Sequence, residues 1–203
     1  MDYIKMLRED SALADLLCEV SDVEVLSEFK TPQDEGGHIS YNISGKTFAR
    51  EKSGSEYILL EDGSVGYWGS EGASGRIADN LGDFLELVIN FPYWKDYIYE
   101  GACQDKELLD EYVEDVLEEH AKEDEEYWPD FLEARQELAR RLGIRITADI
   151  SDILVRFYGC TEREPRLILT YTEDDGSVHR GTGSLFDSNS SAIPIHKLSD
   201  CTI

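Results

Sequence analysis

The sequence contains few basic residues, and this shortage excludes whole classes of partner. Lysine and arginine together number 19, against 44 aspartates and glutamates, so the 203-residue chain carries a formal net charge of −25. A charge of this sign and size repels nucleic acid and anionic membranes. It attracts basic molecules, so we expect a basic protein partner, with no binding to nucleic acid or to a membrane.

Long apolar runs are also missing. The longest strongly apolar stretch, residues 84–91, is far too short to cross a bilayer and is interrupted by Glu86 and Asn90. The residues near the N-terminus are rich in charge and contain no apolar core of signal-peptide length. These observations favour a cytoplasmic protein.

Cysteine and histidine are scarce and scattered. The four cysteines form no CxxC pair, which in a chain of this length is typical of reduced thiols rather than of a disulfide framework. The four histidines form no HExxH or HxH motif, so we predict no metal site. His120 lies among carboxylates, where we expect a solvated helix face rather than a metal ligand.

The motifs of covalent and phosphate chemistry do not occur either. There is no GxSxG elbow, and the glycine-rich stretch 69–75 lacks both the Lys-Ser/Thr of a P-loop and the spacing of a dinucleotide-binding loop. We expect this stretch to form a turn and a helix cap, with Arg76 at the start of the helix. Carboxylates are too numerous to single out a catalytic pair. The sequence therefore predicts a protein that is not an enzyme and needs no cofactor.

What the chain does have is enough apolar and aromatic content, 41% and 10%, to build a core. In the first half, apolar spacing predicts a helix over residues 1–28. Alternating apolar residues predict short strands over the segments 39–43, 47–49, 56–60 and 65–68, with a hairpin turn at Asp62-Gly63. A wide apolar stripe from Ile77 to Ile89 predicts the next helix.

Nearly half of the net charge lies in residues 100–140, where sixteen acidic residues stand against four basic ones. This segment is not of low complexity, because its apolar residues fall on one helix face: Leu108, Leu109, Tyr112, Val113, Val116 and Leu117. A second helix follows, with Trp128, Phe131, Leu132, Leu138 and Leu142 directed inward and Gly143 as its stop. We predict two amphipathic helices with an exposed carboxylate face.

The C-terminal part is expected to be β-rich. Strands are predicted over 150–158, 167–171 and 178–186, with a second hairpin turn at Asp175-Gly176. The whole chain is predicted to be α+β, with an antiparallel or mixed sheet packed against helices, an appended acidic helical pair and a C-terminal β-hairpin region. We divide it into an α+β domain, residues 1–99, and an extension, residues 100–203, either separate or packed with the first as one unit.

Several short motifs between Thr47 and Ile89 follow one another in a familiar order. They are Thr47-Phe48-Ala49, the segment 53–60, Glu61-Asp62-Gly63, the segment 65–68 and the segment 77–85. Their order and spacing are similar to those of the Smi1/Knr4 superfamily, also called SUKH, in which strands pack against a closing helix. The early segment that usually precedes these motifs in the family is matched only weakly, by Thr31-Pro32-Gln33 and Gly36-Gly37. Residues after Glu100 match none of the family's motifs.

The resemblance implies binding and offers no catalytic residues to carry over. Bacterial members of the superfamily resemble immunity proteins that neutralise polymorphic toxins, many of them nucleases, inside the producing cell. A nuclease active face is cationic because it grips phosphates, and an acidic surface complements it. We therefore predict an immunity protein that binds a basic toxin domain through these residues: Glu114, Glu118, Glu119, Glu123, Asp124, Glu125, Glu126 and Tyr127.

Two other interpretations stay open. Eukaryotic members of the superfamily are linked to cell-wall synthesis and signalling, which implies an intracellular scaffold with an acidic face for a different basic partner. A small-ligand-binding regulator or enzyme would instead need a pocket lined by the aromatic residues Tyr67, Trp68, Tyr93, Trp94 and Tyr97, although such residues are more typical of a core. Trp128 also has two interpretations: it is either an anchor of the interface with the partner or a core residue.

Overall fold

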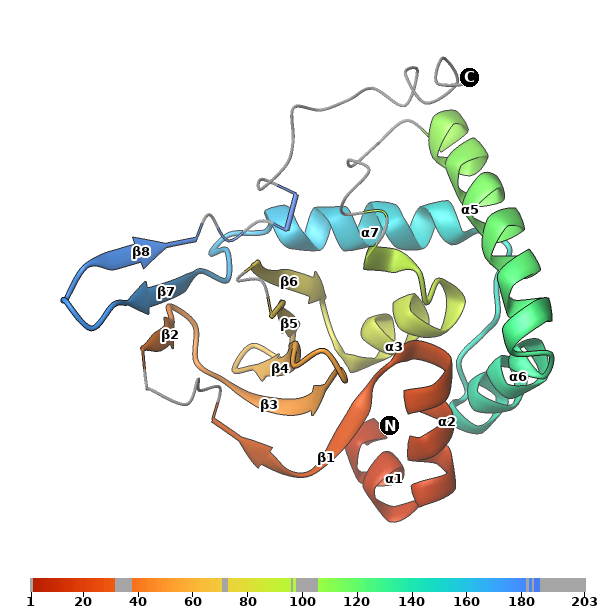
Figure 1. Cartoon of the computed structure of the whole chain (residues 1–203), viewed down its shortest axis with the longest axis horizontal. Helices are drawn as coiled ribbons and strands as arrows, with labels where there is room; N and C mark the ends of the chain where they lie inside the picture. Colours follow the sequence, from red (N-terminus) through yellow and green to blue (C-terminus); the bar gives the residue numbers. More distant parts are fainter. Residues whose placement is uncertain are drawn as a thin grey trace.

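A computed structural model describes residues 2–31, 38–70, 73–95, 97, 106–181, 183 and 185–186. The fold is α+β (Figure 1), and among these residues it contains six helices and two antiparallel sheets. The helices are α1 (Tyr3–Glu9), α2 (Ser11–Ser21), α3 (Leu81–Asn90), α5 (Lys106–Tyr127), α6 (Phe131–Leu142) and α7 (Ile150–Glu162). The strands are β1 (Glu24–Lys30), β2 (Ile39–Tyr41), β3 (Gly45–Arg50), β4 (Glu56–Leu60), β5 (Val65–Trp68), β6 (Ser74–Ala78), β7 (Leu169–Thr172) and β8 (Val178–Arg180).

The larger sheet has the strand order β1-β3-β4-β5-β6, and every neighbouring pair is antiparallel. The smaller sheet, β2-β7-β8, joins a strand of the first half to the C-terminal hairpin. Figure 1 shows this hairpin on one side of the molecule and α5 with α6 on the opposite side. The predicted antiparallel sheet, acidic helical pair and C-terminal hairpin are all confirmed.

The two Asp-Gly hairpin turns have the same geometry. Gly63 and Gly176 have φ of 85° and 84°, a region that favours glycine. In each turn the aspartate Oδ1 accepts a hydrogen bond from the backbone N–H of the serine two residues later, at 3.1 Å for Asp62 and 2.8 Å for Asp175. Local side-chain chemistry therefore explains why the pentapeptides at 61–65 and 174–178 are alike.

The helix predicted over residues 1–28 is wrong in its extent, because three elements occupy it. Asp10 ends α1 and caps α2, its carboxylate accepting from the Leu13 N–H at 3.1 Å. Asp22 then ends α2 in the left-handed region, with φ of 52°, and β1 follows. The Asp10 side chain offers the backbone an alternative hydrogen bond, and the left-handed backbone at Asp22 interrupts the helix, which is why the helical pattern stops at these two positions.

Two further elements differ from the sequence-based predictions. The segment predicted as a strand from residue 150 to residue 158 belongs to the helix α7, whose buried residues Ile150, Ile153, Leu154 and Phe157 repeat at helical spacing. The helix predicted to begin at Ile77 begins at Leu81, because the strand β6 takes up Ile77 and the end of the glycine-rich stretch. Every residue of β6 is buried, so the strand has no alternating pattern to reveal it.

The hydrophobic core draws on both halves of the chain. Phe84 and Val88 of α3 belong to the same buried cluster as Leu109 of α5 and Phe157 of α7. α7 packs alongside β6 and α3, and α6 packs on α2 (Figure 1). The acidic helix α5 is consequently fixed to the core by its apolar face, which leaves its other face to solvent.

Of the four cysteines, Cys18 and Cys160 lie among the described residues, and both are free thiols. Burial raises the pKa of the Cys160 thiol to about 12, and the neighbouring Asp79 carboxylate acts in the same direction. Cys103 and Cys201 lie outside the described residues, as do the turn signals at Pro32, Gly36 and Gly37.

Candidate partner-binding surface

The helix α5 carries two faces of opposite character. Leu109, Tyr112, Val113 and Val116 are buried against the core at helical spacing, as predicted. On the other side Glu111, Glu114, Asp115, Glu118 and Glu119 are exposed. Like charges four residues apart destabilise a helix slightly, so α5 depends on the packing of its apolar face for its stability.

All eight residues predicted to bind the partner lie on this helix. Glu114, Glu118, Glu119, Glu126 and Tyr127 are exposed, and we call the four glutamates, with their solvent side of α5, the acidic face. The remaining predicted residues, Glu123, Asp124 and Glu125, lie within α5, but their side chains are outside the part of the structure that is described. The backbone nevertheless places all eight positions on one continuous helix.

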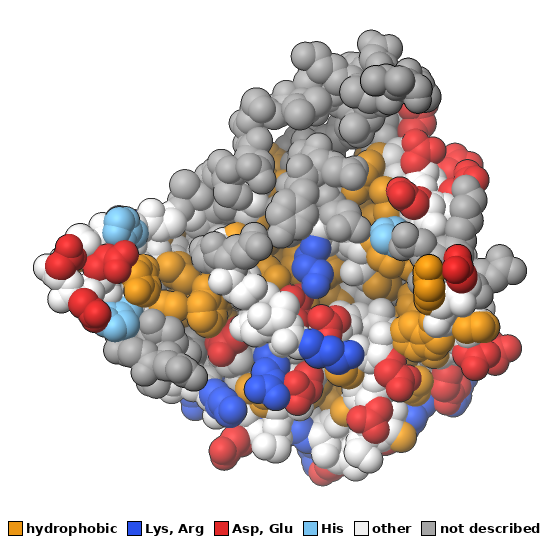
Figure 2. Space-filling view, in the orientation of Figure 1, with side chains coloured by type: hydrophobic (Ala, Val, Ile, Leu, Met, Phe, Trp, Pro, Cys, Tyr) orange, Lys and Arg blue, Asp and Glu red, His pale blue; other side chains and the backbone are white. Residues whose placement is uncertain are grey.

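An apolar corner adjoins the acidic face where α5 meets α6. The Tyr127 side chain is 79% exposed and Leu132 is 62% exposed, the two largest values among the large hydrophobic residues of the described chain. The prediction that Leu132 points inward is therefore wrong. Trp128 is half-buried, with its ring centroid 5.2 Å from that of Phe131, so it combines a core contact with some exposed surface. Figure 2 shows hydrophobic side chains among acidic ones on this side of the molecule.

A groove of about 540 Å³ lies between α5 and the start of α7. It is lined by Asp110, Val113, Glu114, Leu117, Ala148, Asp149 and Ser151. Figure 1 shows α5 passing the first turn of α7. The Ser151 hydroxyl donates a hydrogen bond to the Asp110 carboxylate, which links the two walls. The lining thus combines three apolar side chains with three carboxylates.

Sequence reasoning found one acidic residue of this groove, Glu114, and missed the other two. Asp110 lies one helical turn before Glu114, so the periodicity of the acidic helix was a usable signal for it. Asp149 gave no such signal, because its position depends on α7 being a helix that packs on α5.

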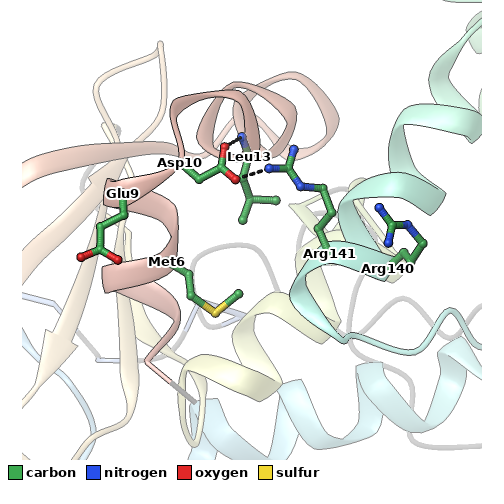
Figure 3. A pocket seen from close by; sticks show the side chains of 6 residues that line it. All are labelled: Met6, Glu9, Asp10, Leu13, Arg140 and Arg141. Carbon is green, nitrogen blue, oxygen red and sulfur yellow. Dashed lines mark hydrogen bonds and ion pairs between the residues drawn. The ribbon is translucent and has the colours of Figure 1, made fainter.

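A second hollow, of about 460 Å³, lies between α1, the start of α2 and the end of α6 (Figure 3). Both of its arginines are paired, Arg141 with Asp10 and Arg140 with Glu137 at 2.7 Å. Its charges are therefore balanced within the protein, and they do not select a partner of either sign. The Asp10–Arg141 ion pair instead attaches α6 to the N-terminal helices.

Glu51 forms the centre of a buried polar cluster near the aromatic residues considered above as a pocket. Its Oε1 accepts from Tyr57 at 2.7 Å and from Lys95 at 3.0 Å, and its Oε2 accepts from Tyr67 at 3.3 Å and from Ser53 at 3.1 Å. Burial raises the pKa of the Glu51 carboxyl, but the Tyr57 hydrogen bond and the Lys95 charge outweigh it and lower the pKa overall. A carboxylate has about four acceptor positions, so this group is occupied by structural partners rather than prepared for proton transfer.

The aromatic residues themselves belong mainly to the core. Tyr67, Trp94 and Tyr97 are buried, and the rings of Tyr67 and Trp94 meet edge to face at 5.1 Å. Tyr93 is half-buried and stacks on His120 of α5, with ring centroids 3.6 Å apart. His120 is thus held against an aromatic ring. The fully solvated helix face expected for it is not what the structure shows.

Arg76 was expected at the start of a helix, but it lies buried in the strand β6. Its guanidinium pairs with Asp62 at 2.8 Å and donates to the Pro165 carbonyl at 3.2 Å. Arg163, which follows α7, also reaches Asp62, at 3.4 Å. Despite partial burial, hydrogen bonds from Ser64 and Arg76 lower the pKa of Asp62 to about 2. This network attaches the C-terminal segment to the larger sheet.

Two searches of the described residues bear on other functions. Within the part of the chain that the structure describes, no group of three His, Cys, Asp or Glu side chains is arranged to hold a metal ion. None of the described helices combines the length and the apolar character needed to cross a membrane. Comparisons with protein-family models, curated proteins and solved structures find no match.

Proposed function

We propose that this protein is a non-catalytic, cytoplasmic binding protein that neutralises a basic, nuclease-type toxin domain by covering its active face. The observation that carries the proposal is the acidic face, a row of exposed carboxylates on a helix that the core holds in place. The motif order over residues 47–89, similar to that of the Smi1/Knr4 superfamily, supports the immunity role.

The charge of the acidic face supports fast and selective association. Residues 100–140 carry a net charge of −12. A surface of this sign raises the encounter rate with a cationic protein and disfavours anionic competitors. Since a nuclease must present cations to its phosphate-bearing substrate, covering those cations blocks the substrate and requires no chemistry from the inhibitor.

The apolar corner supplies binding energy that charge alone does not provide. Interface energy is concentrated in a few large side chains, and tyrosine and tryptophan are favoured among them. Tyr127 is exposed beside the acidic face; Trp128 follows it directly, between α5 and α6, and Leu132 lies in the first turn of α6. In the proposed complex the carboxylates guide the partner, and Tyr127 anchors it.

The first prediction tests the acidic face with the proposed basic toxin domain, to be identified by affinity pull-down and from the genes that neighbour the coding region of this protein. We expect the variant E118Q/E119Q/E126Q to bind it about tenfold or more weakly, because three favourable charges are lost. Binding of the unaltered protein should also weaken as NaCl rises from about 50 mM to about 300 mM. Calorimetry or biolayer interferometry measures both effects.

A matched control separates the acidic face from the overall charge. The variant D15N/E19Q/E28Q removes three exposed carboxylates on α2 and β1. It should retain nearly the full affinity. Equal weakening by the two variants would show that only net charge matters, and insensitivity to both would contradict the proposed surface.

A further inference from the structure

We infer that the partner-binding surface continues past α5 onto the first turn of α6, where the apolar corner receives a large apolar side chain that lysines or arginines of the partner flank. This inference rests on the proposed function and names the chemistry of a contact outside the acidic face. Tyr127 is 79% exposed and Leu132 is 62% exposed, and Pro129 between them in sequence is exposed as well. Single exposed apolar residues are ordinary on a protein surface, whereas a group of them indicates an interaction site.

The apolar corner is held in position by the core. The ring of Trp128 meets that of Phe131 edge to face, with centroids 5.2 Å apart, and Phe131 is 5% exposed within the hydrophobic core. The Phe131 N–H also donates to the Trp128 carbonyl at 3.0 Å, which fixes the connection between α5 and α6. A surface that is ordered before binding loses little conformational entropy in a complex, so more of its contact energy contributes to affinity.

The charges around the apolar corner select its occupant. Residues 126–133 contain three acidic residues, Glu126, Asp130 and Glu133, and no basic one. All three are exposed, and none forms an ion pair with a cation among the residues that the structure describes. An apolar side chain with lysine or arginine beside it therefore packs on the corner while its neighbouring cations meet carboxylates at the rim.

Other occupants lack one half of this match. A purely cationic segment leaves the exposed side chains of Tyr127 and Leu132 in water, and an uncharged apolar surface brings no cation to the carboxylates around them. A second copy of this chain brings the same acidic rim and a net charge of −25, so repulsion opposes it. Anionic membranes are repelled for the same reason.

The test uses the full chain and two peptide probes. One is a peptide of about fifteen leucines and lysines at helical spacing, which presents apolar and cationic side chains together, and the other is deca-lysine, which presents charge alone. We expect Y127Q/L132Q to bind the leucine–lysine peptide about tenfold or more weakly, because interface energy is concentrated in a few large side chains. Its binding of deca-lysine should change little. Titration calorimetry measures both affinities.

V178Q is the matched control. Val178 is 61% exposed on β8, on the opposite side of the molecule from α5 and α6 (Figure 1). The variant removes an equally exposed apolar side chain, and it should bind both peptides as the unaltered protein does. Nuclear magnetic resonance gives a second readout of position, because the leucine–lysine peptide should shift the amide signals of Tyr127 and Leu132 and leave that of Val178 in place.

No binding of the leucine–lysine peptide, or equal binding of it by Y127Q/L132Q and the control, would overturn the inference. A dimer in sedimentation velocity, or binding to phosphatidylcholine vesicles, that Y127Q/L132Q abolishes would overturn it in favour of a second copy or a membrane as the occupant. The proposed function is judged separately. Weakened binding of the toxin domain by E118Q/E119Q/E126Q would leave the acidic face standing, and absence of that effect would contradict the proposed function as well.

Discussion

Glu51 is a charged residue inside the protein, and its partners decide whether that position is tolerated. Its side chain is 2% exposed, and four donors surround its two oxygens. The cluster joins the end of β3 to β4 and β5 and to Lys95 in the segment after α3. A buried carboxylate with a complete set of donors stabilises the fold, whereas removing its charge leaves Lys95 without compensation.

The Glu51 cluster gives a pH-dependent stability prediction. The pKa of Glu51 is lowered in the folded protein from a value of 4.5. The ionised carboxylate therefore contributes stability that is complete above that value and is lost as the pH falls through the folded pKa. We expect E51Q to be less stable by about 1–3 kcal/mol at pH 7, with the difference shrinking below about pH 4.

Urea unfolding of the unaltered protein and E51Q at several pH values measures this effect. The control is E61Q, which alters an exposed glutamate in the turn after β4 and should change stability little. A difference between E51Q and the unaltered protein that stays constant from pH 7 to pH 3 would contradict the role assigned to the ionised carboxylate.

At the scale of the element, α5 combines the proposed binding surface with an intrinsic cost in helix stability. Glu111, Asp115 and Glu119 are exposed and spaced four residues apart, so each adjacent pair repels. This acidic stripe makes no contribution to packing, because the apolar side of the helix provides the contacts with the core. The stripe therefore lowers the stability of the helix without contributing to packing, which is the pattern we expect of the proposed binding surface.

This repulsion predicts that α5 can be stabilised by one substitution. D115K places a lysine between Glu111 and Glu119 and turns two repulsive pairs into attractive ones. We expect about 0.5–1 kcal/mol of added stability at low salt, and less in about 1 M NaCl because salt screens exposed charges. Urea unfolding checks the change, and D115Q, which removes charge without adding any, should give an intermediate value. Destabilisation by D115K would mean that Asp115 has a structural role.

At the scale of the whole molecule, the net charge of −25 opposes folding as well as favouring a basic partner. Self-repulsion destabilises a compact state, and the cost falls as salt screens it. The described ion pairs Arg76–Asp62 and Arg141–Asp10 offset part of the repulsion by linking distant segments. The remaining excess is exposed, much of it on α5.

Thermal unfolding should therefore depend on salt. We expect the Tm to rise by several degrees between about 20 mM and about 500 mM NaCl, which corresponds to roughly 1 kcal/mol or more of relieved repulsion. Calorimetry measures the rise, and KCl should give the same result, since screening depends on ionic strength rather than on the cation. A Tm that is constant or falls with salt would contradict this account.

The sequence allowed most of the strands to be predicted, and its failures have physical causes. β4 and β5 follow from alternation and from the Asp-Gly turn between them. The α7 segment was predicted as a strand because it is short and apolar, whereas its burial repeats with the period of a helix. β6 was missed because it is buried along its whole length, and Asp149 was missed because it follows from α7.

The sequence by itself determined the charge of the molecule, the amphipathic character of α5 and α6 and both hairpin turns. These properties depend on composition and on neighbours a few residues apart, which the order of the residues contains directly. The tertiary structure decided that Asp110 and Asp149 lie across one groove, that Arg76 is buried against Asp62, and that Tyr67 and Trp94 belong to the core. Those outcomes depend on which elements pack together, because contacts between distant segments leave no local pattern in the chain.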